Sequence, residues 1–336
     1  MPDRDALVSA MAVLVAGAVD AAVGELPDRV HPVAGMGTLI KALETRRPVG
    51  DPHAELAWGA MMTALTVGLA GATGWVAERR ARRLSPPARV AATALALKPA
   101  FALRGLVEAG RNVRTALETD SDRARDALKA LVSRDRRLDP PHIVSAAVES
   151  LAENLTDSVL APLLAYAVLG LPGAYAYRAV NTLDAMVGYR GDYEYVGKAA
   201  ARLDDVANFV PARLAGLLLC TVAAARGRGR AAVAALAAAR RAADSPNKMW
   251  TIAPMAGALD VQLEKPGHYR AGAGRRPLTP EVIDDAVRVT WETGAVCIAL
   301  AAGLGSIMAR RRSRRRRLRA FTGAGACASC SPGGCA

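Results

Sequence analysis

The sequence predicts an all-α, multi-pass helical integral membrane protein with about five transmembrane helices and polar helical segments between them. Hydrophobic residues make up 52% of its 336 residues and aromatic residues only 4%, which suits helices packed through small side chains rather than an aromatic-rich β core. Clusters of Arg directly follow apolar stretches, as they do in membrane proteins. No segment of useful length alternates polar and apolar residues with the period of a strand.

Five apolar stretches are the predicted transmembrane helices, because each approaches the ~20 residues that cross ~30 Å of hydrocarbon. They comprise residues 6–23, 56–76, 155–177, 206–225 and 289–308. The second stretch contains no charged residue, whereas the third contains Asp157 and the fourth contains Arg213. Ionisable groups at membrane depth are costly, so these two are candidates for a functional role.

The segments between these stretches are predicted to be helical without crossing the membrane. Residues 85–106 carry three basic residues in an apolar background, so we expect an interfacial or buried helix there. Residues 111–137 are strongly charged and are expected to be soluble, and residues 231–243 should form a short Ala-rich helix. Together, residues 1–309 are expected to form a single helical membrane catalytic domain.

The C-terminal residues 310–336 are Arg-rich and then rich in Gly, Ser and Cys, which predicts a disordered tail. Its cysteines Cys327, Cys330 and Cys335 could bind a soft metal, but no fourth ligand is evident. The other two cysteines lie in apolar stretches and are expected to be packing residues: Cys220 and Cys297.

The net charge of +13 is concentrated in three runs, at residues 79–83, 226–230 and 310–319. Each run follows an apolar stretch, which favours a lipid bilayer over nucleic acid as the partner of these charges. By the same rule, the run at 79–83 should face the cytoplasm.

A first polar cluster opens the apolar stretch at residue 155. In a helix Glu149, Glu153 and Asp157 stand four residues apart, so the three carboxylates fall in one narrow stripe. Like charges at this spacing repel one another, and burial makes the repulsion worse. A divalent cation among them would make the stripe favourable, and Mg²⁺ prefers carboxylate and phosphate oxygens. The alternative is a solvated acidic helix face.

Two further clusters follow within about 65 residues. In one, Arg178, Asn181 and Asp184 succeed each other at three-residue steps along one helix edge. In the other, Asn208 follows Asp204 and Asp205 at helical spacing, just before Pro211 and Arg213. Either cluster alone is weak support, because charged residues commonly cap helices. Three clusters that all border apolar segments are better explained by a metal–phosphate site.

The order of these motifs resembles the CobD/CbiB family, the adenosylcobinamide-phosphate synthases of cobalamin biosynthesis. The matching stretches are His31-Pro32-Val33, Lys98-Pro99, Ser133-Arg134-Asp135, residues 147–154 (AVESLAEN) with Asp157, Ala161-Pro162-Leu163, residues 177–189 (YRAVNTLDAMVGY), residues 201–208 (ARLDDVAN) with Pro211 and Arg213, Asp244-Ser245-Pro246-Asn247 and residues 255–259 (MAGAL). The resemblance covers residues 15 to 275. Two parts depart from the family pattern: Lys248-Met249-Trp250, and the extension beyond residue 310.

The resemblance implies an amide-forming ligase that acts on a corrinoid. It also implies a multi-pass protein of the cell (inner) membrane, and we expect its active site to face the cytoplasm. Its substrate would be adenosylcobyric acid, whose remaining propionate would be joined to (R)-1-amino-2-propanol or its O-phosphate. ATP as co-substrate and Mg²⁺ are implied as well, since a carboxylate must be activated before an amine can attack it. No Walker A or G-x-G-x-x-G sequence marks an ATP site.

The resemblance and the clusters together yield a set of site residues with hypothetical roles. Acids assigned to catalysis are Glu149, Glu153, Asp184 and Asp205. Acids assigned to Mg²⁺ are Glu149, Glu153, Asp157, Asp184, Asp204 and Asp205. Residues assigned to binding substrate or phosphate are His31, Lys98, Arg134, Asn154, Arg178, Asn181, Arg190, Arg202, Asn208, Arg213 and Asn247.

Two other functions stay open at this stage. A membrane prenyltransferase would also hold Mg²⁺–diphosphate with Asp/Asn stripes, but it needs two separated aspartate-rich motifs. A non-enzymatic membrane scaffold or transporter subunit would need no cluster of acids and amides. Other membrane enzymes of late cobalamin assembly are possible partners. The phosphorylation state of the amine, the ATP site and the oligomeric state stay open too, as does the side of the membrane on which the His31 loop lies.

Overall fold

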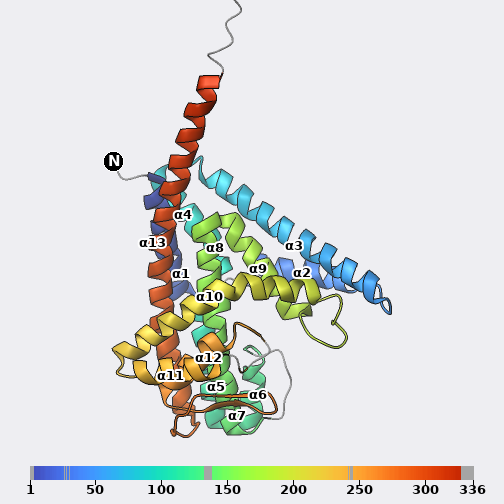
Figure 1. Cartoon of the computed structure of the whole chain (residues 1–336), viewed down its shortest axis with the longest axis vertical. Helices are drawn as coiled ribbons and strands as arrows, with labels where there is room; N and C mark the ends of the chain where they lie inside the picture. Colours follow the sequence, from blue (N-terminus) through green and yellow to red (C-terminus); the bar gives the residue numbers. More distant parts are fainter. Residues whose placement is uncertain are drawn as a thin grey trace, which may run out of the picture.

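The structure is a computed structural model that describes residues 4–25, 27, 29, 31–131, 138–240, 242 and 245–326, with the backbone alone for 315–326. Helices dominate it (Figure 1). The helical elements are α1 (Arg4–Val23), α2 (Pro32–Glu44), α3 (Pro52–Ala81), α4 (Pro86–Leu97), η2 (Lys98–Ala100), α5 (Leu103–Thr119), α6 (Ser121–Leu128), α7 (Pro140–Leu155), η3 (Thr156–Leu160), α8 (Ala161–Leu169), α9 (Leu171–Val187), α10 (Lys198–Ala225), α11 (Gly229–Ala239), α12 (Met249–Leu259) and α13 (Pro280–Ala326).

Five helical segments of the described chain are long and apolar enough to cross a membrane, which confirms the predicted fold class. Four of them contain predicted transmembrane stretches: α1, α3, α10 and α13. The fifth, Pro86–Thr119, joins α4 to α5, where an interfacial or buried helix and a soluble segment were predicted. Those predictions rest on the basic residues of this segment, and the structure pairs Arg89, Lys98 and Arg104 with acidic side chains.

The prediction of a single span over residues 155–177 is wrong. Residues 140–169 form one continuous helical path through α7, η3 and α8, and Gly170 then reverses the chain into α9. Gly170 has φ of 78°, a conformation that glycine adopts without strain. Most side chains from Ile143 to Ala167 are buried, so this part of the path runs through the interior of the bundle (Figure 1). Val168 and Leu169, at the end of α8, are exposed.

A single turn of π-helix interrupts the central path at η3, and a proline explains part of it. Pro162 has no N–H, so the carbonyl of Ser158 loses its usual helical donor. The backbone N–H of Ala102, at the break between η2 and α5, donates to that carbonyl instead (2.9 Å). Such π turns are frequent at functional sites, and this one carries Asp157.

One small hairpin departs from the all-helical prediction. Strands β1 (Leu263–Lys265) and β2 (Tyr269–Ala271) pair antiparallel, with Leu263 opposite Ala271. Three residues a strand are too few for a period-2 pattern to be visible in the sequence. The hairpin lies beside α7, at the lower end of the molecule in Figure 1.

Helix α13 continues through the Arg-rich segment to Ala326, where the sequence predicts a tail. The tail cysteines Cys327, Cys330 and Cys335 lie outside the described residues. Cys220 and Cys297 are buried, as predicted. The Arg-bearing ends of α3 and α13 lie together at the top of Figure 1, whereas α7, α11 and α12 lie at the lower end.

Candidate functional site

Two adjoining chambers lie among α7, η3, α9, α10 and α12, and they share part of their walls. Their volumes are about 350 Å³ and about 410 Å³. The side chains that line both are Glu153, Asp157, Asp184, Tyr189 and Lys248. The smaller, here the α10 chamber, is also lined by Arg190, Arg202, Asp204, Asp205 and Asn208. The larger, here the hairpin chamber, is also lined by Glu149, Asn154, Asn181, Lys265 and Tyr269.

The three sequence clusters meet at the junction of these chambers because three helices deliver them. Glu153 lies near the end of α7 and Asp157 lies in the π turn that follows. Asp184 lies in the last turn of α9, and Asp204 lies in the second turn of α10. Carboxylates separated by as many as 50 residues in the chain therefore face a common space.

Lys248 supplies a positive charge among these acids. Its Nζ lies 3.0 Å from Oε1 of Glu153. The charge of Glu153 raises the pKa of Lys248, and Asp157 and Asp184 act in the same direction. This ammonium group therefore offsets part of the repulsion between the carboxylates.

The acids still carry an electrostatic cost. Burial raises the pKa of Asp157 well above its ordinary value, and the charges of Asp204 and Glu153 raise it further. Burial also raises the pKa of Asp184 to about 6. In the described part of the chain, Oδ1 of Asp204 is buried without a hydrogen-bond partner. A protein keeps such an arrangement when something it binds supplies the missing positive charge.

The donor set at the junction fits Mg²⁺. Carboxylate oxygens from three helices are hard ligands of the kind Mg²⁺ binds, together with phosphate oxygens and water. The unpartnered oxygen of Asp204 is available to such an ion. Among the described residues, no three acidic, His or Cys side chains already converge as a metal-binding group. Phosphate oxygens would complete the coordination of an ion held by one or two of these carboxylates.

Asn208 is a positioning residue for this site. Its side-chain carbonyl accepts a hydrogen bond from the Tyr177 hydroxyl (2.7 Å), and its amide donates to Oδ2 of Asp204 (3.0 Å). Asn208 is 2% exposed, so both bonds form away from bulk water. Asn208 thereby links α9 to the carboxylate of Asp204 and orients it toward the chamber.

Asp205 and Asn247 hold α10 against the turn before α12. The Asn247 amide donates to the backbone carbonyl of Asp205 (2.8 Å), and the Ser245 hydroxyl donates to Oδ1 of Asp205 (3.2 Å). Arg213 donates to Oδ1 of Asn247 (3.2 Å). The Arg213 guanidinium also stacks 4.8 Å from the ring centre of Trp250, and it does not line either chamber.

Glu149 anchors the hairpin to α7. Its carboxylate accepts hydrogen bonds from the hydroxyls of Ser145 (2.7 Å) and Tyr269 (2.6 Å). Ser145 Oγ in turn accepts from the backbone N–H of Glu264 in β1 (2.8 Å). Burial raises the pKa of Glu149, while the two hydroxyls lower it. Both oxygens of Glu149 thus accept hydrogen bonds from hydroxyl donors, and Glu149 lines the hairpin chamber rather than the α10 chamber of Asp204 and Asp205.

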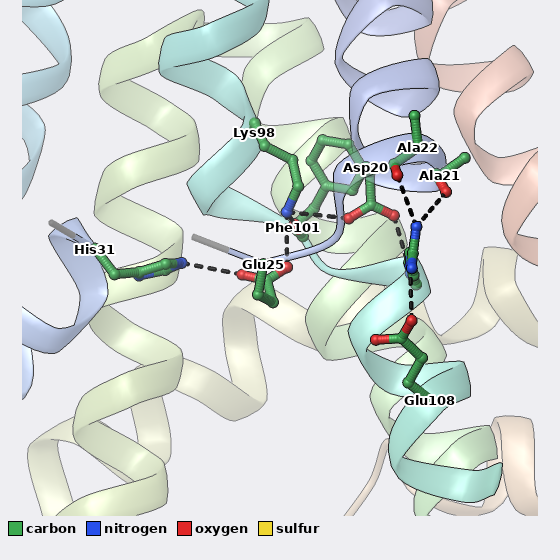
Figure 2. A network of polar contacts seen from close by, with 9 residues as sticks. Asp20, Ala21, Ala22, Glu25, His31, Lys98, Phe101 and Glu108 are labelled. Carbon is green, nitrogen blue, oxygen red and sulfur yellow. Dashed lines mark hydrogen bonds and ion pairs between the residues drawn. The ribbon is translucent and has the colours of Figure 1, made fainter. Parts of the chain in front are cut away.

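His31 and Lys98 lie in a separate ionic network (Figure 2). Lys98 is 2% exposed, and its Nζ lies 3.0 Å from Oδ1 of Asp20 and 2.6 Å from Oε1 of Glu25. The other oxygen of Glu25 lies 3.0 Å from Nε2 of His31. Arg104 donates to the carbonyl oxygens at the end of α1 and pairs with a carboxylate of α5. The network therefore joins α1, α2, η2 and α5, and it does not line the two chambers.

Arg178 lies between this network and the chambers. Its Nη1 donates to Oδ1 of Asn181 (3.2 Å), and its Nε is buried without a hydrogen-bond partner in the described part of the chain. Burial lowers the pKa of Arg178, while the charges of Glu25 and Asp157 oppose that shift. The Arg178 guanidinium thus interacts with an acid of each group.

Most of the predicted site residues therefore come together. Those that line the chambers are Glu149, Glu153, Asn154, Asp157, Asn181, Asp184, Arg190, Arg202, Asp204, Asp205, Asn208 and Asn247. Those that do not are His31, Lys98, Arg178 and Arg213. Arg134 lies outside the described residues.

The structure adds residues that the motifs did not single out as site residues. Lys248 departs from the family pattern in the sequence, and this departure was the one feature that could have indicated a role in the site. Tyr269 and Lys265 come from the hairpin, and no sequence pattern connects them with the acids. Lys198 and Tyr189 flank the loop after α9 and line the α10 chamber.

Fold and site together define a multi-pass helical membrane protein with an acid-lined cavity of two adjoining chambers. The model of the CobD/Cbib protein family matches residues 13–290. The chain is 40% identical over 283 residues to a probable cobalamin biosynthesis protein CobD of Pyrococcus furiosus, covering 84% of this chain and 93% of the relative. It is 38% identical over 295 residues to the cobalamin biosynthesis protein CobD of Dehalococcoides mccartyi, covering 87% and 96%. The chain belongs to the CobD/CbiB family, and its role lies in cobalamin biosynthesis.

A third relative, a probable cobalamin biosynthesis protein CobD of Methanocaldococcus jannaschii, is 37% identical over 263 residues, covering 76% of this chain and 86% of the relative. No solved structure matches the chain. The family assignment favours a biosynthetic enzyme over the prenyltransferase-like and scaffold alternatives.

Proposed function

We propose that this protein forms the amide between the remaining propionate of adenosylcobyric acid and (R)-1-amino-2-propanol or its O-phosphate, with ATP and Mg²⁺. The observation that carries the proposal is the junction of the two chambers, where Glu153, Asp157 and Asp184 lie around Lys248. Two adjoining spaces suit a reaction that brings a nucleotide and a large organic acid to one point.

The α10 chamber is the proposed site for the triphosphate. Arg190, Arg202 and Lys198 line it, and guanidinium groups bind phosphate oxygens through paired N–H donors. Asp157 and Asp204, on the wall of the same chamber, are the proposed holders of Mg²⁺. When bound there, Mg²⁺ would neutralise charge on the phosphate oxygens.

The hairpin chamber is the proposed site for the corrinoid carboxylate. It is the larger space, and apolar residues such as Leu131 and Leu138 share its lining with Lys129, Lys265 and His142. Apolar walls with a few polar groups suit a large ring that carries polar substituents. Asn154 and Asn181 would orient the reacting propionate toward the junction.

The proposed reaction proceeds in two steps. A propionate oxygen attacks the terminal phosphorus of ATP, which releases ADP and leaves the propionate as a mixed anhydride with phosphate. The amine nitrogen then attacks the acyl carbon and displaces phosphate, which forms the amide. Before this attack the substrate ammonium loses one proton to a carboxylate, for which Asp184 is the proposed acceptor because it lines both chambers. The second proton of the nitrogen leaves with the displaced phosphate.

The direct test is product analysis by mass spectrometry. Membranes that contain the full-length protein receive adenosylcobyric acid and aminopropanol, with or without its phosphate, while ATP is supplied or withheld. We expect an amide product in which one propionate is consumed, and only when ATP is present. Product without nucleotide would contradict the ATP-dependent step while leaving amide formation intact.

Variants test the assigned residues in the same assay. Glu153→Gln and Asp184→Asn should each lower the rate by about 100-fold or more, because each removes a charge from the junction. Glu55→Gln, at a half-buried position in the first turn of α3 that lines neither chamber, is the matched control and should keep the wild-type rate. A folded Glu153→Gln protein with full activity would remove Glu153 from the site.

A further inference from the structure

A second polar cavity lies at the end of the molecule where the Arg-bearing ends of α3 and α13 meet. It has a volume of about 60 Å³ and lies between the ends of α1, α3, α4, α8 and α13. Three guanidinium groups line it, those of Arg82, Arg89 and Arg312, against two carboxylates, those of Asp5 and Glu78. We call it the arginine cavity. Its net charge is positive, and its residues are separate from those of the two chambers.

The two carboxylates of the arginine cavity hold two of its guanidinium groups in place. Oδ1 of Asp5 lies 2.6 Å from Nη1 of Arg89, and Asp5 also accepts a hydrogen bond from Ser313 on α13. Glu78 pairs with Arg82 and accepts a hydrogen bond from the backbone N–H of Leu171 (3.0 Å), at the start of α9. These bonds fix two of the guanidinium groups at the cavity wall.

The third guanidinium, that of Arg312, caps a helix. Its Nη1 donates to the carbonyl of Val168 in the last turn of α8 (2.6 Å). A guanidinium carries five N–H donors in one plane, so this bond leaves other donors of Arg312 that can bind an oxyanion. A space of this size admits a group on the order of a phosphate, that is, a few water molecules in volume.

The surroundings of the arginine cavity are apolar and exposed. Leu7 of α1 is 58% exposed, Leu169 at the end of α8 is 65% exposed, and Ile307 of α13 is 51% exposed. Nearby on α3, Trp75 is 52% exposed with the Arg79 guanidinium over its ring at 5.2 Å. Exposed apolar side chains on candidate membrane helices face lipid, and Trp beside Arg is typical of the membrane–water interface.

We propose that the arginine cavity binds the phosphate of an anionic membrane phospholipid, whose acyl chains lie along the exposed apolar residues around it. A phosphate supplies negative charge and acceptor oxygens for three guanidiniums, and basic pockets between membrane helices bind lipid headgroups in this way. A soluble phosphate would satisfy the same donors, but it would not use the apolar surroundings.

The test uses the full-length protein in bilayer nanodiscs that contain phosphatidylglycerol and phosphatidylcholine in equal amounts. Native mass spectrometry measures the lipids retained after mild release. We expect phosphatidylglycerol to be retained about tenfold over phosphatidylcholine. In the double variant Arg89→Gln/Arg312→Gln this preference should fall to near equality, while amide formation shows that the protein is folded.

Two further arms complete the test. Arg312→Lys keeps the charge but not the planar fork, so it should retain part of the preference. Arg288→Gln, an exposed arginine 65% accessible at the other end of α13, is the matched control and should keep all of it. Equal retention of both lipids by the wild type, or an unchanged preference in the double variant, would overturn the proposal. Inorganic phosphate that displaces the retained lipid completely would reassign the cavity to a soluble anion.

Discussion

At the scale of single residues, the functional site depends on charges held close together. Glu153, Asp157 and Asp184 share one junction with Lys248, and the ammonium group offsets only part of their repulsion. Repulsion between buried like charges lowers the stability of the fold, and proteins retain it where binding or catalysis needs those charges.

Asp157→Asn tests this trade-off. The substitution removes one of the like charges from the π turn, so the protein without Mg²⁺ should unfold about 2–4 °C higher, which corresponds to about 1 kcal/mol. Amide formation should fall by about 100-fold or more, because the proposed metal ligand is lost. Thermal unfolding and the mass-spectrometric assay measure the two effects. A lower unfolding temperature would show that Asp157 stabilises the fold.

Glu149 allows a test by pH. Because burial raises its pKa, the folded protein binds the proton of Glu149 more tightly than the unfolded chain does. Its contribution to stability is therefore present below the ordinary pKa of a Glu carboxyl and is lost as pH rises through the raised value. Glu149→Gln stays neutral, so its stability relative to the wild type should increase from about pH 4 to pH 7. Parallel stability curves for the two proteins would contradict this.

At the scale of elements, close backbone contacts place the loop after α9. A Cβ at Gly59 of α3 would lie 2.0 Å from the carbonyl oxygen of Val196, so α3 approaches this loop through glycine. The same loop contributes Tyr189 and Arg190 to the α10 chamber. The geometry of the proposed phosphate site therefore depends on a residue in another helix.

Gly59→Ala should displace this loop. We expect the KM for ATP to rise about tenfold or more, since a shift of about 1 Å in positioning residues has effects of that size. Gly68→Ala, on the same helix, meets nothing within 4 Å and should leave KM unchanged. Equal KM values for the two variants would show that the loop tolerates the displacement.

The sequence predicted the long apolar helices and the three polar clusters, because both depend on local spacing. It could not show that the central path from α7 to α8 is interior, since a buried helix and a membrane-spanning helix are both apolar. It also placed His31 and Lys98 with the active site, whereas the structure pairs them with Glu25 and Asp20 in a different network. Such pairing depends on contacts between helices, which local spacing does not encode.

At the scale of the whole molecule, two expectations from the sequence disagree about which end of the molecule faces the cytoplasm. The positive-inside rule puts the Arg-bearing end of α3 in the cytoplasm, whereas an ATP-dependent reaction puts the two chambers there. In Figure 1 the Arg-bearing end lies at the top, and the α7 and α12 helices that line the chambers lie below it. Because the candidate membrane helix α13 runs between these two regions, we expect the regions to lie on opposite faces of the bilayer.

Single cysteines test this arrangement in a chain whose Cys327, Cys330 and Cys335 are replaced by Ser. His268→Cys lies on the exposed hairpin, and Arg83→Cys lies on the exposed end of α3. A membrane-impermeant maleimide should label them from opposite sides of sealed vesicles. We expect His268→Cys to react in inverted vesicles, where the cytoplasmic face is outside. Labelling of both from one side would contradict the opposed arrangement.

The sequence by itself determined that this is a helical membrane protein of the CobD/CbiB type, because hydrophobic length, charge runs and ordered motifs are properties of the linear chain. It also predicted that acids from three segments belong to one site. Only the tertiary structure decided which of them meet at the junction of the two chambers, and that Lys248 lies among them. It also decided that Glu149 accepts hydrogen bonds from the hairpin and that the arginines of α3, α4 and α13 surround a second cavity. These features depend on how helices distant in sequence pack against one another, and packing is set by the whole fold rather than by local spacing.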